Sequence, residues 1–234
     1  MRLLEREHPS DVLSGRAEQA AAGRGSVVLV AGEAGIGKTA LLRAFAAAAP
    51  VPVLWGMCDP LSTPRPLGPL RDVADGLGSE MTAALAGAVA QHEIFAIALD
   101  ALRARPRALV VEDLHWGDGA TLDLVRFLAR RIASLPLLLV VSYRDAVDAS
   151  RPLGAVLGDL VSAADARRLQ LAPLSRGAVA RLLEGHDLDP ADVHRRTAGN
   201  PFFVSQIAEQ PGSPLPESVR DAVLSRVAPL SPQA

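Results

Sequence analysis

Several features are scarce in this chain of 234 residues. A single cysteine, Cys58, excludes an internal disulfide and suits a reducing cytoplasm. No apolar run approaches the roughly 20 residues that a membrane-spanning helix requires, and residues 1–7 carry charges where a secretory signal needs apolar residues. The net charge of −2 does not suggest a nucleic-acid-binding surface. These features predict a soluble cytoplasmic protein with no membrane association.

Lysine is the scarcest charged residue, because Lys38 is the only one among 24 lysine and arginine residues. It lies in GEAGIGKT, which matches the phosphate-loop pattern G-x-x-x-x-G-K-[ST]. The backbone N–H groups of such a loop wrap a polyphosphate, the lysine reaches the β and γ phosphates, and the hydroxyl of Thr39 coordinates Mg²⁺. The pattern predicts a nucleoside triphosphate site formed by Gly32, Glu33, Ala34, Gly35, Ile36, Gly37, Lys38, Thr39 and Ala40.

The residues around this loop support the prediction. An apolar, β-branched run at 26–31 is typical of a buried strand, and residues 39–49 favour a helix that stops before Pro50. A strand, a glycine loop and a helix in this order direct the N-terminus of the helix at an anion. The arrangement therefore favours a phosphate site over a simple glycine turn.

Further apolar runs predict four more strands, at 51–55, 107–113, 137–142 and 168–171. One helix is expected before the first strand, at 11–22, and others between the strands, at 70–77, 81–103, 120–132 and 153–163. Alternating apolar strands and helices indicate a parallel five-stranded sheet covered on both faces, an α/β fold of the three-layer P-loop NTPase type.

The strand pattern stops at Pro173, which predicts three parts in the chain. Residues 1–172 would form the nucleotide-binding core, and residues 173–210 a small α-helical lid with helices at 176–183, 190–196 and 201–209. Residues 211–234 would form a linker with one more helix at 217–227.

Two acids, Glu112 and Asp113, end the third predicted strand. A phosphate loop needs a carboxylate on a neighbouring strand to hold Mg²⁺, often with a second acid that orients the attacking water. In open α/β sheets, ligands collect at the carboxyl ends of the strands, where these acids would lie. The alternative is that they are ordinary solvated acids at a strand end.

The segment that follows, LHWGDGATLD at 114–123, resembles the "DLHWAD…TLD" segment of the STAND class of signalling ATPases. The similarity is strongest to the ATPase modules of large LuxR-type bacterial transcriptional regulators. It extends to the phosphate loop and to WGMCDPL at 55–61, SYRD at 142–145 and TAGNPFF at 197–203. In those regulators winged-helix, helical-repeat and helix-turn-helix modules follow, so the resemblance implies that residues 211–234 hold the start of a truncated following module.

The resemblance implies roles for individual residues. Glu112 and Asp113 would form the Mg²⁺-binding and water-activating pair, with Asp113 favoured as the base and the division between them open. Arg144 would read the γ-phosphate, as a donor fork suits, although a surface arginine is the alternative. Pro201 would contact the nucleotide, although Asn200 and Pro201 also suit the start of a helix.

Other notable residues have simpler interpretations. His115 and Trp116 are expected to be structural, with Trp116 as an apolar plug at the sheet edge, and Asp118 to cap the next helix. Cys58 is expected to be a buried packing thiol. The remaining histidines show no metal-ligand spacing. The pair Arg130–Arg131 suits a solvated helix face, with a trans-acting arginine finger as the alternative.

The residues predict an ATP-binding, Mg²⁺-dependent site, and the resemblance implies an ATPase that hydrolyses slowly and acts as a signalling switch. Its partners would be ATP and ADP and an unknown protein or a second copy, and we expect no DNA binding by this chain, because one helix at 217–227 cannot form a helix-turn-helix. Two alternatives stay open. One is a P-loop phosphotransferase for a small molecule, and the other is an interaction module that binds ATP without turning it over.

Overall fold

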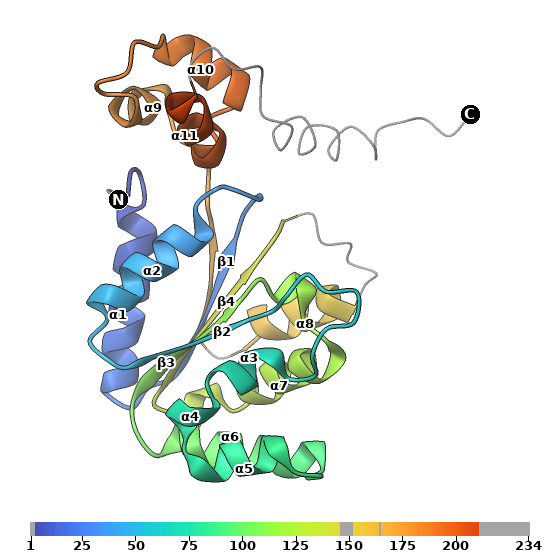
Figure 1. The fold of residues 1–234 in the computed structure, drawn as a ribbon. Coiled ribbons are helices and arrows are strands. Elements are labelled where there is room, and N and C mark those ends of the chain that lie inside the picture. The colour runs from blue at the N-terminus through green and yellow to red at the C-terminus, as the bar shows by residue number, and fades with distance from the viewer. Residues whose placement is uncertain (1–2, 146–151, 164, 211–234) are drawn as a thin grey trace. The chain divides into compact units, whose positions relative to one another are not determined.

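The computed structural model describes residues 3–145, 152–163 and 165–210 (Figure 1). These residues form two compact units. Of the described residues, the sheet unit contains 6–34, 38–145, 152–163 and 165–171, and the helical unit contains 3–5, 35–37 and 172–210. The phosphate-loop segment is therefore divided between the two units.

Five parallel strands form the centre of the sheet unit, in the order β2-β3-β4-β1-β5. Their bounds are Ser26–Ala31 for β1, Val53–Met57 for β2, Arg107–Glu112 for β3, Leu137–Tyr143 for β4 and Ala166–Gln170 for β5. The predicted five-stranded parallel sheet is confirmed. We had expected the strand that leads into the phosphate loop, β1, and the strand that carries the acids, β3, to be neighbours. This was wrong, because β4 lies between them.

Helices cover both faces of this sheet (Figure 1). Two lie on one face, α1 (Glu7–Ala21) and α2 (Lys38–Ala48). The other face carries α3 (Gly68–Asp72), α4 (Ala74–Leu77), α5 (Ser79–Ala86), α6 (Gln91–Arg103), α7 (Gly119–Ala129) and α8 (Pro152–Val161). Successive side chains of a strand point to opposite faces of the sheet, so each strand contributes to the packing on both faces. Val27 and Leu29 of β1 pack into the core beneath α6, α7 and α8, whereas Val28 and Val30 are buried on the opposite face.

Helix breaks account for the main departures from the expected elements. The single helix expected at 81–103 is two helices, separated by the segment from Gly87 to Ala90. The helix expected at 70–77 is also two, and it begins earlier, at Gly68, with Pro69 in its first turn. Proline is tolerated there because the first N–H groups of a helix have no intrahelical partner.

Three short helices form the helical unit: α9 (Arg176–Leu182), α10 (Pro190–Thr197) and α11 (Pro201–Glu209). Their small core consists of Leu174, Ala178, Val179, Leu183, Val193, Val204, Ile207 and Ala208. The N-terminal segment also belongs to this unit, since Leu4 packs against the core and the carboxylate of Glu5 accepts a 2.9 Å hydrogen bond from the Ser175 backbone.

The helix expected at 217–227 lies outside the described residues, so the three-part domain division stays a prediction. In the part of the chain that the structure describes, no helix has the length and apolarity needed to cross a membrane.

Candidate functional site

Lys38 is the first residue of α2, directly after the glycine loop. Its side chain is buried, and its ammonium donates hydrogen bonds to the carbonyl oxygens of Gly32 (2.8 Å) and Glu33 (2.9 Å). Burial lowers the pKa of Lys38, and the negative charge of Asp113 acts against this shift. The cation is thus held against the loop that the sequence predicts to bind phosphate, where an anionic ligand would compensate its desolvation.

Glu112 ends β3 with its carboxylate almost fully buried, at 2% exposure. Its two oxygens take different donors: the hydroxyl of Thr39 donates to Oε1, and the indole Nε1 of Trp55 donates to Oε2 at 3.2 Å. The structure therefore brings Thr39 and Glu112 together across the intervening strand β4. A hydroxyl and a carboxylate are oxygen ligands that suit Mg²⁺, which keeps several of its waters.

Asp113 has a different environment from the acid that precedes it. Its backbone is left-handed, with φ of 55°, and its N–H donates to the Ser142 hydroxyl at 2.9 Å. Left-handed backbone at a residue other than glycine costs about 1–3 kcal/mol and persists only where the surroundings enforce it. The side chain of Asp113 is 34% exposed, so water reaches this carboxylate.

His115 lies beside Asp113, with 3.8 Å between its Nδ1 and the Asp113 Oδ1. Burial lowers the pKa of His115 to about 4; the Asp113 charge opposes the shift, and Arg144 and Lys38 add to it. The imidazole is therefore neutral near pH 7, and this contact is not an ion pair at that pH. Within the described residues, both ring nitrogens are buried without a hydrogen-bond partner.

Arg144 follows β4, and its guanidinium lies 5.7 Å from the centre of the Trp116 ring, in cation–π range. Arg144 is exposed, and its charge acts on both Lys38 and His115. Trp116 itself is 38% exposed, so it is not the apolar plug that we had expected. The structure thus places Arg144 at the same edge of the sheet as the lysine and the acids.

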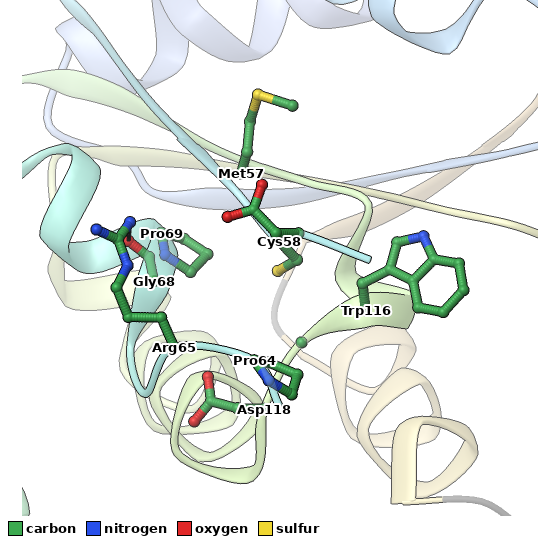
Figure 2. Close-up of a pocket in the computed structure, with 10 residues that line it drawn as sticks. Met57, Cys58, Pro64, Arg65, Gly68, Pro69, Trp116 and Asp118 are labelled. Atoms are coloured by element: carbon green, nitrogen blue, oxygen red, sulfur yellow. Dashed lines mark hydrogen bonds between the residues drawn. The ribbon is translucent and has the colours of Figure 1, made fainter. Parts of the chain in front are cut away.

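A small hollow beside this edge is shown in Figure 2. Its accessible volume is about 10 Å³, and its lining residues are Met57, Cys58, Asp59, Pro64, Arg65, Gly68, Pro69, Trp116, Gly117 and Asp118. That volume is room for about one water molecule, so this hollow is not a nucleotide pocket.

Two residues of the hollow behave as the sequence predicted. Cys58 is buried, and burial together with the Asp118 charge raises the pKa of its thiol to about 12, as suits a packing residue. Asp118 caps α7, because its carboxylate accepts from the Ala120 N–H at 2.9 Å.

In the helical unit, the loop tip at Gly35 meets the start of α11. The Phe202 N–H donates to the Gly35 carbonyl at 3.3 Å and to the Asn200 side chain at 3.1 Å. Gly35 has φ of 75°, and a Cβ added there would lie 2.8 Å from the Cβ of Phe202, so only glycine fits. Asn200 is the N-cap and Pro201 the first residue of α11, which confirms the helix-start interpretation; the nucleotide contact of Pro201 stays a prediction.

The arginine pair after the acids lies on an exposed surface. Arg130 is 3.6 Å from the Asp159 carboxylate, and the guanidinium of Arg131 stacks 3.8 Å above the Phe127 ring. Both contacts are within the sheet unit and suit a solvated helix face. Over the described ranges, no group of three or more histidine, cysteine or acidic residues is arranged to hold a metal ion.

Two residues of the site were missed by sequence reasoning. Trp55 and Ser142 were each noted as the last residue of a predicted strand and the first residue of a resemblance segment, WGMCDPL and SYRD, and neither was given a role in the site. Neither has a local signature, because each acts on an acid far away in the sequence. The signal that would have found Trp55 is its alignment with Val110 in the β2–β3 register, two residues before Glu112.

Comparison with known proteins now identifies the family. Residues 2–141 match the model of the AAA ATPase domain. The chain belongs to this family. An uncharacterized protein of Rhizobium meliloti (strain 1021) is 29% identical over 259 residues, covering 88% of this chain and 25% of that protein. The AAA ATPase chain therefore spans about a quarter of the length of that relative.

Solved structures share the fold of this AAA ATPase domain. A signal transduction ATPase with numerous domains (STAND) and a tetratricopeptide repeat sensor, from Pyrococcus horikoshii, matches 99% of this chain and 33% of its own, with TM-score 0.58 and 16% identity. Cdc6p from Pyrobaculum aerophilum matches 96% of this chain and 64% of its own, with TM-score 0.62 and 14% identity.

The Aeropyrum pernix ORC2 protein, solved as ADPNP–ADP complexes, matches 95% of this chain and 68% of its own, with TM-score 0.59 and 17% identity. At these identities the similarity concerns the fold alone. It confirms the predicted P-loop ATPase fold for this chain.

Proposed function

We propose that this AAA ATPase module binds ATP with Mg²⁺, hydrolyses it slowly and acts as a signalling switch in a LuxR-type transcriptional regulator. The observation that carries the proposal is the convergence of Lys38, Thr39 and Glu112 at one edge of the sheet, with Thr39 donating to Glu112. A buried cation, a hydroxyl and a buried carboxylate in this arrangement are the groups that a nucleotide triphosphate and its metal require.

In the proposed mechanism, the loop backbone and the Lys38 ammonium hold the phosphates. Thr39 and Glu112 would hold Mg²⁺, which when bound neutralises charge on the β and γ phosphates. Both oxygens of Glu112 already accept hydrogen bonds from the protein, whereas Asp113 is open to water. This difference supports Asp113 as the residue that orients the attacking water, and Glu112 as the acid that binds Mg²⁺.

The switch depends on a group that distinguishes ATP from ADP. Arg144 is exposed at the same edge, and its contact with the Trp116 ring is weak enough to exchange for a phosphate. Pro201 would contact the base. Because ATP has a γ-phosphate and ADP does not, the two nucleotides would favour different conformations, and the populations would shift with hydrolysis.

The two alternatives are less well supported. A phosphotransferase would use arginines of the helical unit to close on phosphates, yet Arg195 and Arg196 lie 2.8 Å and 3.6 Å from the Asp192 carboxylate on their own helix. An interaction module without turnover would need no water-accessible acid beside the proposed metal ligands, and Asp113, whose side chain is 34% exposed, is such an acid.

Calorimetry of ATP and ADP binding, with and without Mg²⁺, tests the proposal on this chain and on Lys38→Ala. We expect micromolar ATP binding by the wild type and its loss in the variant, with a slow-turnover assay giving less than about one ATP per second. Binding without any formation of ADP over hours would support the interaction module. An absence of ATP binding by the folded wild-type chain would contradict the proposal.

Arg144→Ala tests the switch separately. If Arg144 contacts the γ-phosphate, the variant weakens ATP binding about tenfold and leaves ADP binding within about twofold. Arg131→Ala is the matched control, because it removes an exposed arginine of the same unit that stacks on Phe127. Equal losses for ATP and ADP in Arg144→Ala would contradict a role in reading the γ-phosphate.

A further inference from the structure

Trp55 lies on β2, the edge strand of the sheet, and has no role in the function proposed above. In the parallel register of β2 and β3, Trp55 aligns with Val110 and Met57 with Glu112. Side chains two residues apart on a strand share a face. Trp55 and Glu112 therefore point to the same face of the sheet, and the indole is long enough to reach the carboxylate.

The contact between them is a hydrogen bond of 3.2 Å from the indole Nε1 to the Glu112 Oε2. Glu112 is 2% exposed, so its charge has little access to water and depends on the donors around it. The second donor is the Thr39 hydroxyl, on the other carboxylate oxygen. Two donors on different oxygens fix the plane of the carboxylate as well as its position.

The chemistry of the two donors differs. The Thr39 hydroxyl has lone pairs and is a metal ligand as well as a donor, whereas the indole N–H is a donor only and cannot bind a metal. A carboxylate offers about four acceptor sites, so Glu112 accepts both hydrogen bonds and still has lone pairs for a cation. The indole thus holds Glu112 without competing for Mg²⁺.

We propose that Trp55 is a positioning residue, which orients the Glu112 carboxylate for the metal that accompanies the nucleotide. The inference rests on the proposed function, because it assumes that Glu112 and Thr39 hold Mg²⁺. It assigns a role to a residue on the edge strand whose indole N–H contacts the Glu112 carboxylate. Its consequence is that the affinity for Mg²⁺, and not for the nucleotide alone, depends on the indole N–H.

Two substitutions separate the hydrogen bond from packing. Trp55→Phe keeps an aromatic ring and removes the N–H. Trp55→His keeps an N–H, because the imidazole Nε2 is as many bonds from Cβ as the indole Nε1, and removes the second ring. A hydrogen-bonding role predicts that histidine restores function, whereas a packing role predicts that phenylalanine does.

The measurement is ATP binding by calorimetry across a Mg²⁺ titration, at about pH 8, where the introduced histidine is neutral. We expect Trp55→Phe to raise the half-saturating Mg²⁺ concentration about tenfold and Trp55→His to stay within about threefold of the wild type. With the metal chelated, ATP affinity stays within about twofold in both variants. In a Glu112→Gln background, Trp55→Phe should cause no further change.

The outcomes distinguish a failure of the proposed function from a failure of the role proposed for Trp55. If the wild type shows no Mg²⁺-dependent ATP binding, the proposed function fails, and the inference fails with it. If the wild type shows it and Trp55→Phe matches the wild type, or Trp55→His is as defective as Trp55→Phe, only the role of Trp55 is overturned. If thermal unfolding shows that Trp55→Phe does not fold, Trp55→His alone decides, and a tenfold shift in it overturns the inference.

Discussion

The sheet unit and the helical unit bury polar side chains in different ways. In the sheet unit, Glu112 is hydrogen-bonded to Thr39 and Trp55, which lie 73 and 57 positions away in the sequence. In the helical unit, the Thr197 hydroxyl donates to the backbone four residues away, and the Asn200 side chain accepts from the backbone two residues away. The sheet unit thus joins side chains that are far apart in the sequence, whereas the helical unit forms hydrogen bonds between side chains and nearby backbone groups.

The two kinds of hydrogen bond differ in how far they stabilise the fold. A local bond to a helix end stabilises by about 1 kcal/mol and needs no ligand to explain it. A buried carboxylate costs several kcal/mol to desolvate, and its partners seldom return more than that. The burial of Glu112 is therefore poorly explained by stability and suits the metal-binding role proposed above, whereas Asn200 is explained by the helix that it starts.

The largest effect is expected from Glu112→Gln, because it removes the charge and nearly keeps the shape. We expect Mg²⁺-dependent ATP affinity to fall at least about a hundredfold, since a neutral amide is a poor Mg²⁺ ligand. Calorimetry across a Mg²⁺ titration measures the change. Asp123→Asn, the same change at an exposed position of α7, is the control. If both variants bind alike, the contrast between the two units fails.

Asp113→Asn tests the division between the two acids. Loss of a group that orients or activates water lowers turnover by about a hundredfold, and we expect ATP affinity to change less than about threefold. A slow-turnover ATPase assay at saturating Mg²⁺ and ATP measures it. If the variant loses ATP binding rather than turnover, Asp113 binds Mg²⁺ instead of orienting water.

Gly199→Ala acts on the helical unit through the backbone. Gly199 has φ of 73°, and a Cβ there would lie 2.2 Å from the Leu174 carbonyl oxygen. We expect the free energy of unfolding to fall by about 2–3 kcal/mol, measured by chemical denaturation. Gly185→Ala is the matched control, because Gly185 has φ of 89° and open space around it, and it should cost about 1 kcal/mol. Equal losses would show that the contact with Leu174 contributes nothing.

Asn200→Ala removes the N-cap of α11, whose side chain accepts from the Phe202 N–H at 3.1 Å. Loss of such a cap costs about 1 kcal/mol of unfolding free energy. The shift in thermal unfolding measures it, and Asn200→Asp, which keeps an acceptor, should restore most of the loss. A loss in Asn200→Asp as large as in Asn200→Ala would argue against the cap.

Pro201→Ala is expected to have the smallest effect, and it tests whether the start of α11 has any role besides its structural one. Stability should change by a few tenths of a kcal/mol, since alanine is also accepted at the first helical position. If Pro201 contacts the base, ATP affinity falls about threefold to fivefold through lost apolar contact. Calorimetry with ATP and ADP decides, and an unchanged affinity would leave Pro201 with a structural role alone.

Local patterns predicted much of this protein. The strand at 26–31 has the predicted bounds, the helix at 201–209 begins and ends where expected, and Asp118 and Asn200 cap the helices that follow them. These features are local because apolar runs, prolines and capping side chains act within a few residues. The break of the alanine-rich segment at 81–103 into two helices was missed, since alanine favours a helix throughout and the break lies at Gly87.

Local sequence patterns were sufficient to predict the parallel α/β sheet, the phosphate-loop segment around Lys38 and the acids at the end of a buried strand. The position of β4 between β1 and β3, and the contacts of Glu112 with Thr39 and Trp55, became known from the folded structure alone. The order and register of strands come from packing between segments far apart in the chain, and no local pattern encodes them. The hydrogen bonds that orient the buried carboxylate are consequences of that packing.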